Sequence, residues 1–171
     1  MKRKESLFTG IILIYILAFT SCEKYDTDIE GDVDIYLLSQ YQTEYIGSAI
    51  LNEGLVLSEE PAISYSEILK YNSHDFTFKL KQSAIDRIED KFGSAFAVTV
   101  DGEVIYTGYF WAAFSSATVD WIVIDLVLGL EDDEITVQLG YPWLFDEWNI
   151  PDKRNDRRIL SVFARDKKLI D

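Results

Sequence analysis

Apolar and polar residues alternate along several short stretches of the chain, a pattern typical of strands with one buried face. The plainest case is residues 75–81, in which Phe76, Phe78 and Leu80 fall on the same face. This spacing predicts a strand, because successive side chains of a strand point to opposite sides. Related patterns predict further strands over residues 32–38, 44–58, 119–128 and 135–142, with a break in the second at residues 52–54.

A hairpin is predicted over residues 94–111, which contain two apolar runs. Asp101 and Gly102 separate these runs. An Asp-Gly pair is the usual centre of a type I′ turn, which joins two neighbouring antiparallel strands.

Two other stretches space their apolar residues at helical intervals. In residues 82–92, Ser83 is a candidate N-cap, and Gly93 follows as a stop signal. Residues 152–171 carry basic side chains near their end, where they favour the helix dipole. Residues 59–73 are interpreted as a short helix or an irregular crossover. The apolar stripes consist of Ala84, Ile85, Ile88 and Phe92 in the first stretch, and of Ile159, Leu160, Val162 and Phe163 in the second.

The order of these elements predicts the fold class. Strands come first, then a helix, a hairpin, more strands and a last helix. We therefore expect an α+β fold, with an antiparallel sheet and one or two helices packed on one of its faces. An all-β sandwich would not explain the two helical patterns.

The first residues follow a different pattern. Residues 1–5 carry Lys2, Arg3 and Lys4 against one acid, and residues 7–19 are almost entirely apolar. This run is shorter than the roughly 20 residues that span a bilayer. It is typical of a signal peptide that is cleaved on export.

Cys22, the only cysteine in the chain, follows Thr20 and Ser21 directly. This arrangement resembles a bacterial lipobox, with Phe19 in place of the usual Leu. The resemblance implies cleavage before Cys22 and attachment of acyl chains to its sulfur. The alternative is a plain secretory signal with an incidental thiol, although a lone thiol is a liability in an oxidising compartment. We expect a signal peptide, an acidic tether and a single α+β domain, over residues 1–21, 22–34 and 35–171.

The residues after Cys22 bear on the location. Glu23 is not the Asp that retains enterobacterial lipoproteins in the inner membrane, so the outer membrane is favoured. The acids of residues 26–34 partly resemble the surface-export signals of Bacteroidota lipoproteins, and the alternative is a solvated linker. The periplasmic and the cell-surface side both stay open.

The charge of the chain excludes one class of partner. The formal net charge is −14, and it becomes −16 once the three bases and one acid of residues 1–21 are removed. Nucleic acid requires a basic footprint, so it is not an expected partner. A flat contact with an anionic membrane is disfavoured for the same reason.

The usual catalytic sets are missing from the sequence. His74 is the only histidine, so a catalytic triad or a two-histidine metal site would need a second chain. Asp120 and Asp125 lie five positions apart in a predicted strand and face opposite sides. Residues 131–134 are all acidic but lack the spacing of a calcium loop, so we interpret them as a solvated turn. We predict no enzyme, no metal site and no cofactor.

Two groups of aromatic residues are the remaining candidates for a binding surface. The first spans residues 106–121, where alternation points some rings inward and some outward. Buried core is the expected role of this group, because aromatic rings bury a large apolar area. The second lies in a predicted loop between Gly140 and Pro151. Exposed rings there would suit stacking on sugars or contact with a protein, whereas a loop folded back on the sheet would bury them. The candidate contact residues are Tyr141, Trp143 and Trp148.

The whole chain resembles the small Bacteroidota lipoproteins that carry no assigned activity. The lipobox, the acidic tether and the stretches 107–125 and 150–160 carry this resemblance. Residues 76–106 also resemble the strand–helix–hairpin unit of the SecD periplasmic domain, which implies a fold relation only. After that unit SecD continues Ser-Ala-Pro, whereas here Tyr106, Thr107 and Gly108 follow.

These observations predict a non-enzymatic, lipid-anchored protein of the outer membrane. It would bind or scaffold an envelope protein that the sequence does not identify. The alternative is a glycan-binding accessory lipoprotein at the cell surface.

Overall fold

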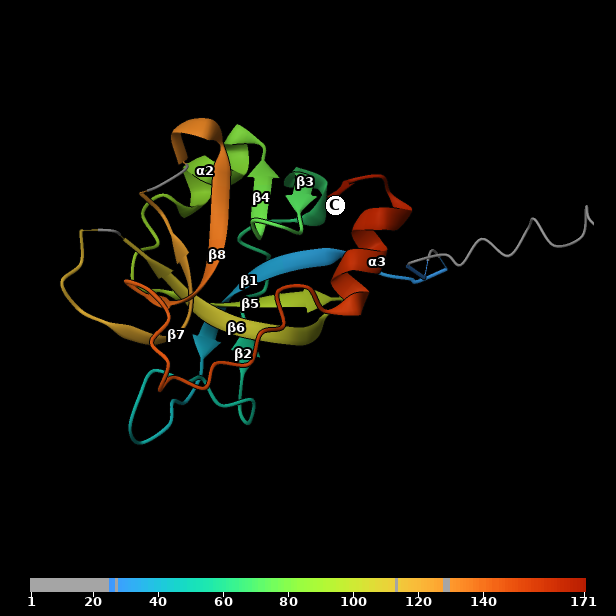
Figure 1. The fold of residues 1–171 in the computed structure, drawn as a ribbon. Coiled ribbons are helices and arrows are strands. Elements are labelled where there is room, and N and C mark those ends of the chain that lie inside the picture. The colour runs from blue at the N-terminus through green and yellow to red at the C-terminus, as the bar shows by residue number, and fades with distance from the viewer. Residues whose placement is uncertain (1–24, 27, 113, 128–129) are drawn as a thin grey trace, which may run out of the picture.

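The computed structural model describes residues 25–26, 28–112, 114–127 and 130–171. Within them the chain forms a mixed α+β fold, with two α-helices and a nine-stranded, mostly antiparallel sheet (Figure 1). The predicted fold class is confirmed at this level. The strands are β1 (Val33–Gln40), β2 (Val56–Leu57), β3 (Ile68–Asn72), β4 (Thr77–Leu80), β5 (Ala95–Val100), β6 (Glu103–Trp111), β7 (Val119–Asp125), β8 (Glu134–Tyr141) and β9 (Leu169–Ile170). The helices are α2 (Gln82–Ile88) and α3 (Arg157–Arg165), with 3₁₀ turns η1 (Tyr65–Glu67) and η2 (Leu130–Asp132).

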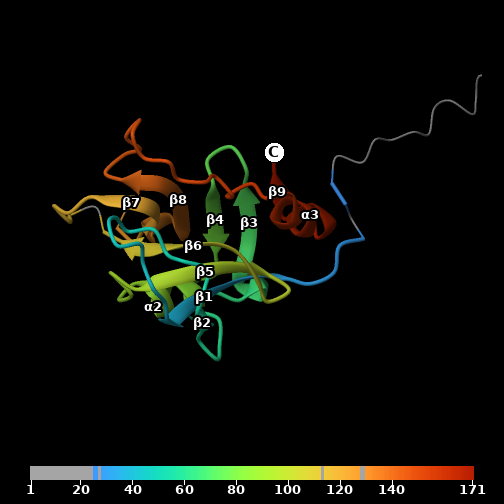
Figure 2. The same cartoon turned by 90° about the horizontal axis from the view of Figure 1, so that it is seen from below.

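The strands follow the order β2-β1-β5-β6-β7-β8-β4-β3-β9 across the sheet. Neighbours are antiparallel except for the pairs β6–β7 and β3–β9. Strands β1, β5 and β6 cross the direction of β8 and β4 steeply in Figure 1, so the sheet is strongly twisted. Figure 2 shows α3 beside β3 and β9, at one side of the sheet.

The predicted hairpin is present between β5 and β6. Asp101 has φ +51° and Gly102 has φ +75°. Two successive residues with positive φ are what a type I′ turn requires. The turn chemistry therefore sets the register in which Val100 faces Glu103.

One large apolar cluster forms the main core. Its strand residues include the predicted stripe of Phe78 and Leu80, both almost fully buried. Both helices contribute to the same cluster. Each is short and polar on most of its surface, so that only a narrow apolar stripe is buried against the core. The helical members are Ala84, Ile85 and Ile88 of α2 and Ile159, Val162 and Phe163 of α3.

A second, smaller cluster lies on the opposite face of the central strands. Ala95 and Ala97 of β5 belong to it, whereas Phe96 and Val98 belong to the main core. All six residues of β5 are therefore buried, and all except Thr99 are apolar. Residues Ile50, Leu55 and Leu57 cover this second cluster.

Three details of the predicted elements differ from the structure: the strand segment 44–58, the N-cap of the first helix, and the place of Phe92. Residues 44–58 contain only the two-residue strand β2, because most of this segment forms a loop. The helix α2 ends at Ile88 and begins after Lys81, so Ser83 is not its N-cap. Phe92 lies beyond the helix and is 46% exposed.

The C-terminal stretch and the crossover also differ from the expectation. The helix α3 begins at Arg157, where the Asp156 carboxylate accepts a hydrogen bond from the Arg158 N–H at 3.0 Å. Strand β9 follows α3, and strand β3 follows η1, in regions without a strand signal. These two strands pair with each other in parallel, which no local pattern predicts.

Glu67 joins η1 to α2 through a network of hydrogen bonds. Its two carboxylate oxygens accept from Arg87 Nη1 and Nη2 at 2.8 and 2.9 Å. Ser83 Oγ donates to the same carboxylate at 2.8 Å. The hydrogen bonds from Arg87 are the main cause that lowers the pKa of Glu67 to about 2.

Replacement of Glu67 should cost stability in a pH-dependent way. At pH 7 we expect Glu67→Gln to lower the free energy of unfolding by about 1–2 kcal/mol, because hydrogen bonds to a charged group are lost. A lowered pKa means that the carboxylate stabilises the fold above its ordinary value of 4.5 and that this contribution is lost as the pH falls to about 2. Urea unfolding of both proteins at several pH values should therefore show a gap that closes in acid.

Glu103 provides the matched control. It pairs with Arg158 at 2.9 Å, but its side chain is 74% exposed. Glu103→Gln should change the free energy of unfolding by less than about 0.5 kcal/mol at any pH. A Glu67→Gln gap that stays constant down to pH 2 would contradict the ionic role of Glu67.

Candidate functional site

The predicted aromatic loop follows β8, and its base packs against the last but one residue of that strand, Gly140. This residue has φ +80°, and a Cβ there would lie 2.6 Å from Cζ3 of Trp148. The Trp148 ring therefore packs directly on the backbone at the end of β8, which only glycine permits. Trp148 is half-buried as a result.

Phe145 connects Trp148 to the exposed part of the loop. Its ring centroid lies 4.7 Å from that of Trp148 and 5.5 Å from that of Trp143. The backbone N–H of Trp148 donates to the backbone carbonyl of Phe145 at 3.0 Å, which closes the turn. Trp143 and Leu144 remain 63% and 48% exposed on the outer side of this packed base.

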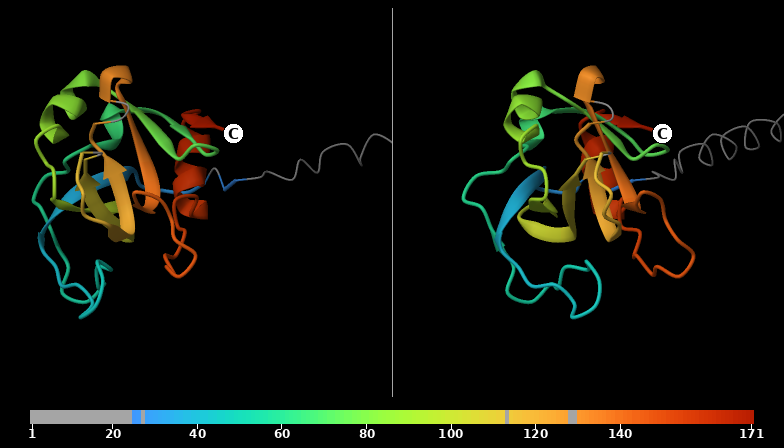
Figure 3. Two further views of the ribbon diagram at one scale, coloured as in Figure 1. Left: turned by 60° about the vertical axis from the view of Figure 1, so that its left-hand side comes forward. Right: turned by 90° about the vertical axis from the view of Figure 1, so that its left-hand side faces the viewer.

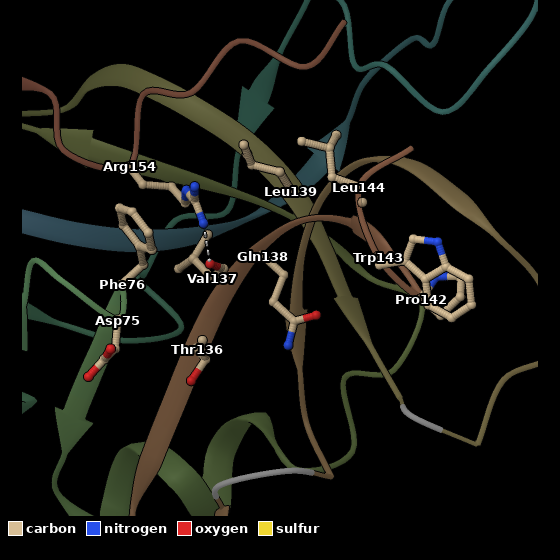
Figure 4. A pocket seen from close by; sticks show the side chains of 11 residues that line it. Asp75, Phe76, Thr136, Val137, Gln138, Leu139, Pro142, Trp143, Leu144 and Arg154 are labelled. Atoms are coloured by element: carbon tan, nitrogen blue, oxygen red, sulfur yellow. Dashed lines mark hydrogen bonds between the residues drawn. The ribbon is translucent and has the colours of Figure 1, made fainter. Parts of the chain in front are cut away.

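An open groove of about 390 Å³ lies beside Trp143 (Figure 4). One wall comes from β8 between Thr136 and Gly140, and another from the turn between β3 and β4. Of the three predicted contact residues, only Trp143 lines this groove. Tyr141 instead packs against Trp111 at 6.3 Å and contacts the second core cluster, and Trp148 packs against Gly140 and Phe145.

Arg154 forms part of the groove wall, and three hydrogen bonds hold its guanidinium group. Its Nε and Nη2 donate to Asp152 at 2.9 and 2.7 Å, and its Nη1 donates to the Val137 carbonyl at 3.1 Å. These bonds lower the pKa of the Asp152 carboxyl. The guanidinium also lies 3.5 Å above the Phe76 ring centroid, within cation–π range.

Phe76 has a strained backbone at the edge of the groove. Its φ of +57° lies in the left-handed region, which bulky side chains avoid at a cost of about 1–3 kcal/mol. The Phe76 carbonyl accepts the Val137 N–H at 3.0 Å, and Arg154 covers the ring. These contacts hold the conformation and keep the wall of the groove in place.

The polar groups that a ligand can reach come from Gln138, Thr136 and Asp75. In Figure 4 the Gln138 amide stands between Thr136 and Trp143. Asp75 accepts from Asn72 Nδ2 at 2.9 Å, and Thr136 shares a hydrogen bond with Thr77 at 3.0 Å. The groove therefore combines one exposed indole with neutral and acidic hydrogen-bonding groups, an arrangement suited to binding.

A second exposed loop covers residues 41–51 and includes the first part of segment 44–58, for which the sequence predicted one or two strands. Tyr45 is fully exposed and Ile46 is 82% exposed at its tip. The Asp120 carboxylate accepts the Ser48 N–H at 2.6 Å, and Tyr109 Oη donates to the Ser48 carbonyl at 2.9 Å. The base of the loop is thus attached to the sheet while its tip projects.

Both loops project from the same end of the molecule (Figure 3). Their flanks also meet, since Ile50 and Asn52 line a cavity of about 110 Å³ together with Pro151 and Lys153. We call the four exposed side chains at this end the loop rim: Tyr45, Ile46, Trp143 and Leu144. The sequence pointed to Trp143, whereas no pattern distinguished Tyr45 and Ile46 from a strand.

The other candidate groups have structural contacts. Asp120 holds the second loop, and Asp125 is buried and accepts the Val127 N–H at 2.7 Å. Lys79 lies 3.9 and 4.0 Å from Asp133 and Glu134 in the acidic turn. Among the described residues, no three potential metal ligands of the His, Cys, Asp or Glu type gather at one point.

The first aromatic group divides between core and surface. Tyr106, Tyr109 and Phe110 are buried as expected, and Trp121 is partly buried. Phe114 is 77% exposed and contacts Phe92 at 5.7 Å. The strand rings of this group are therefore buried or partly buried and Phe114 lies outside, which agrees with a predicted mixture of inward and outward rings.

Cys22 lies outside the described residues, as do the rest of residues 1–24. None of the helices in the described part of the chain is long and apolar enough to cross a membrane.

Substitution of Gly140 should disturb the base of the aromatic loop. We expect Gly140→Ala to lower the free energy of unfolding by about 2–4 kcal/mol, because a left-handed backbone cost adds to the displacement of Trp148. Gly93 is the matched control, since it has φ +79° but no atom within 4 Å of the point that a Cβ would occupy. Gly93→Ala should cost only about 1–2 kcal/mol in urea unfolding. Equal losses for the two variants would contradict the packing role of Trp148.

The chain matches no protein-family model, and no curated protein and no solved structure matches it either.

Proposed function

We propose that this chain is a lipoprotein of the outer membrane, made with a cleaved signal peptide over residues 1–21 and anchored through acyl chains on Cys22. The basic start, the short apolar run and the lone cysteine support this proposal. Acyl chains contribute about 0.8 kcal/mol for each buried CH₂, so several chains hold firmly.

We also propose that α2 and α3 pack on one face of the sheet. The buried residues of both helices belong to the main core cluster, together with Phe78 and Val98 of the strands. The smaller cluster on the other face contains no helical residue among those described.

The domain itself acts by binding, as a non-enzymatic partner or scaffold of another envelope protein. The observation that carries this proposal is the loop rim, where two loops expose Tyr45, Ile46, Trp143 and Leu144 at one end. Ring packing holds the base of one loop, and hydrogen bonds hold the base of the other. Tyrosine and tryptophan dominate the energetics of protein interfaces, and aliphatic neighbours exclude water around them. An acidic chain with a net charge of −16 in its mature form stays soluble and selects against acidic partners.

A glycan is the second candidate ligand, and the groove favours it. Trp143 offers an exposed ring for stacking on a sugar face, and Gln138 and Asp75 lie in the same groove as hydrogen-bonding groups. In this alternative the protein is an accessory lipoprotein that holds a polysaccharide at the cell surface.

Loss of the cysteine should release the protein from the membrane. We expect Cys22→Ser to move the chain from the detergent phase to the aqueous phase in a Triton X-114 partition, and to abolish labelling by radioactive palmitate. Ser21→Ala is the control, because it keeps a small residue before the cleavage site and should leave both readouts unchanged. Membrane retention of Cys22→Ser would overturn the anchor.

The loop rim should contact a specific partner in native membranes. We expect a benzoyl-phenylalanine photo-cross-linker at position 46 or 143 to give one discrete adduct of the same mass. A cross-linker at Glu89, which is exposed near the end of α2, should give none. Trp143→Ala, in a chain with the cross-linker at position 46, should reduce the adduct several-fold, because the interface would lose its central aromatic ring.

Absence of a protein adduct would contradict the scaffold proposal and favour glycan binding in the groove. In that case purified chain should show quenching of Trp143 emission on titration with envelope polysaccharides, and Trp143→Ala should lose the signal. Unchanged emission with every glycan tested would overturn the second candidate as well.

A further inference from the structure

The first described residues lie against α3. Tyr25 Oη donates to Asp171 Oδ1 at 2.9 Å, and the Asp26 N–H donates to Ser161 Oγ at 3.1 Å. Ser161 is itself 1% exposed, so the second contact lies at a buried point of the helix. The blue N-terminal segment accordingly runs beside α3 in Figure 2.

Arg165 extends this contact along the segment. Its Nη1 donates to the carbonyls of Ile29 and Gly31 at 3.0 and 2.8 Å, and its Nη2 lies 3.3 Å from Asp32 Oδ1. The Ile29 side chain packs against the main core. Residues 25–26 and 28–32 are therefore docked on the domain, although the sequence suggested a tether there.

The docking leaves little chain between the body and the lipid. Three peptide steps separate Cys22 from Tyr25, and fully extended they reach about 11 Å. A lipid-anchored chain of this length cannot let the domain turn freely, since Tyr25 is fixed to the C-terminal end of the fold. The end of the domain that carries Tyr25 must stay near the membrane surface.

The charge of this side suits such a position. Residues 25–26 and 28–32 contact the basic segment 157–171. The sequences 25–32 and 157–171 together carry five basic and six acidic side chains. Residues 22–171 as a whole carry 13 basic and 29 acidic side chains. The excess negative charge therefore sits elsewhere on the domain, and salt screens its repulsion by anionic headgroups over a Debye length of about 8 Å.

From these observations we propose that the α3 side of the domain faces the lipid surface and that the loop rim points away from it. This orientation rests on the proposed anchor at Cys22. In Figure 1 α3 lies at the right-hand side of the molecule, whereas the two projecting loops lie at its lower end, so the loops are directed away from α3. The lipid headgroups contact the α3 side of the domain, and the loop rim stays accessible to a partner.

The test uses the full lipidated chain in vesicles of phosphatidylethanolamine with a minority of phosphatidylglycerol and a headgroup-nitroxide lipid. Because Cys22 is then modified, a new cysteine can be labelled alone with bimane. Arg157→Cys places the probe one helical turn from Ser161, and Tyr45→Cys places it on the loop rim. We expect the probe at position 157 to lose most of its emission and the probe at position 45 to keep most of it.

A longer tether should remove this difference without disturbing the fold. A Gly/Ser insert of about 12 residues between Lys24 and Tyr25 adds a flexible span of about 20 Å. We expect the quenching at position 157 to fall toward that at position 45 in this variant. Arg165→Ala should act in the same direction by undocking the segment, with circular dichroism to verify folding.

The outcomes separate the orientation from the anchor. Equal quenching at both positions in vesicle-bound protein of native tether length would overturn the orientation and leave the anchor intact. A lipidation-competent chain that fails to float with the vesicles would overturn the anchor itself, and with it the orientation.

Discussion

The packing of Phe163 against three aromatic rings is the contact on which the rest of the structure depends. Its ring centroid lies 5.2 Å from Tyr71, 5.8 Å from Tyr65 and 6.0 Å from Phe78. These rings come from β3, η1 and β4, so one side chain of α3 joins the end of the chain to the strands at the edge of the sheet. Each such pair contributes about 0.5–1.5 kcal/mol beyond its buried area. Because α3 is held here, both β9 and the N-terminal segment have a fixed surface to dock on.

Much of the fold could be predicted from local pattern, and the failures share a physical cause. Alternation located β1, β4 and β8, and the turn at Asp101 located the β5–β6 hairpin, because these signals act between near neighbours. Strands β3 and β9 depend on each other across much of the chain, and neither has a periodic signal strong enough to predict it alone. The segment 44–58 has strand-like residues, but Asp120 and Tyr109 bond to Ser48 and hold its tip away from the sheet. Tertiary contacts decide these elements, so propensity has little weight there.

The candidate site was predictable only in its most unusual residue. Trp143 could be named because an aromatic run in a Pro-flanked loop is conspicuous. The partners of Trp143 in the groove come from the β3–β4 turn, from β8 and from Arg154, which are brought together by pairing of β4 with β8. The different fates of Trp143 and Trp148 follow from Gly140, since the missing Cβ lets one ring pack on the backbone and leaves the other outside. Without knowledge of that contact, a sequence pattern cannot show which of two tryptophans five positions apart is the exposed one.

The contacts at the bases of the two loops bear on the proposed binding role of their exposed apolar side chains. An exposed ring on a mobile loop must lose conformational freedom when it binds, at about 0.5–1.5 kcal/mol for each side chain that is immobilised. Here Phe145 and Trp148 hold the base of one loop, and Asp120 and Tyr109 hold the base of the other. In the proposed binding role, much of the ordering cost would therefore be met during folding, by contacts that exist without a partner. The strained backbone of Phe76, fixed by Arg154 and Val137 at the edge of the groove, follows the same principle. In the proposed role, a surface built in this way would gain affinity because its shape is set before binding.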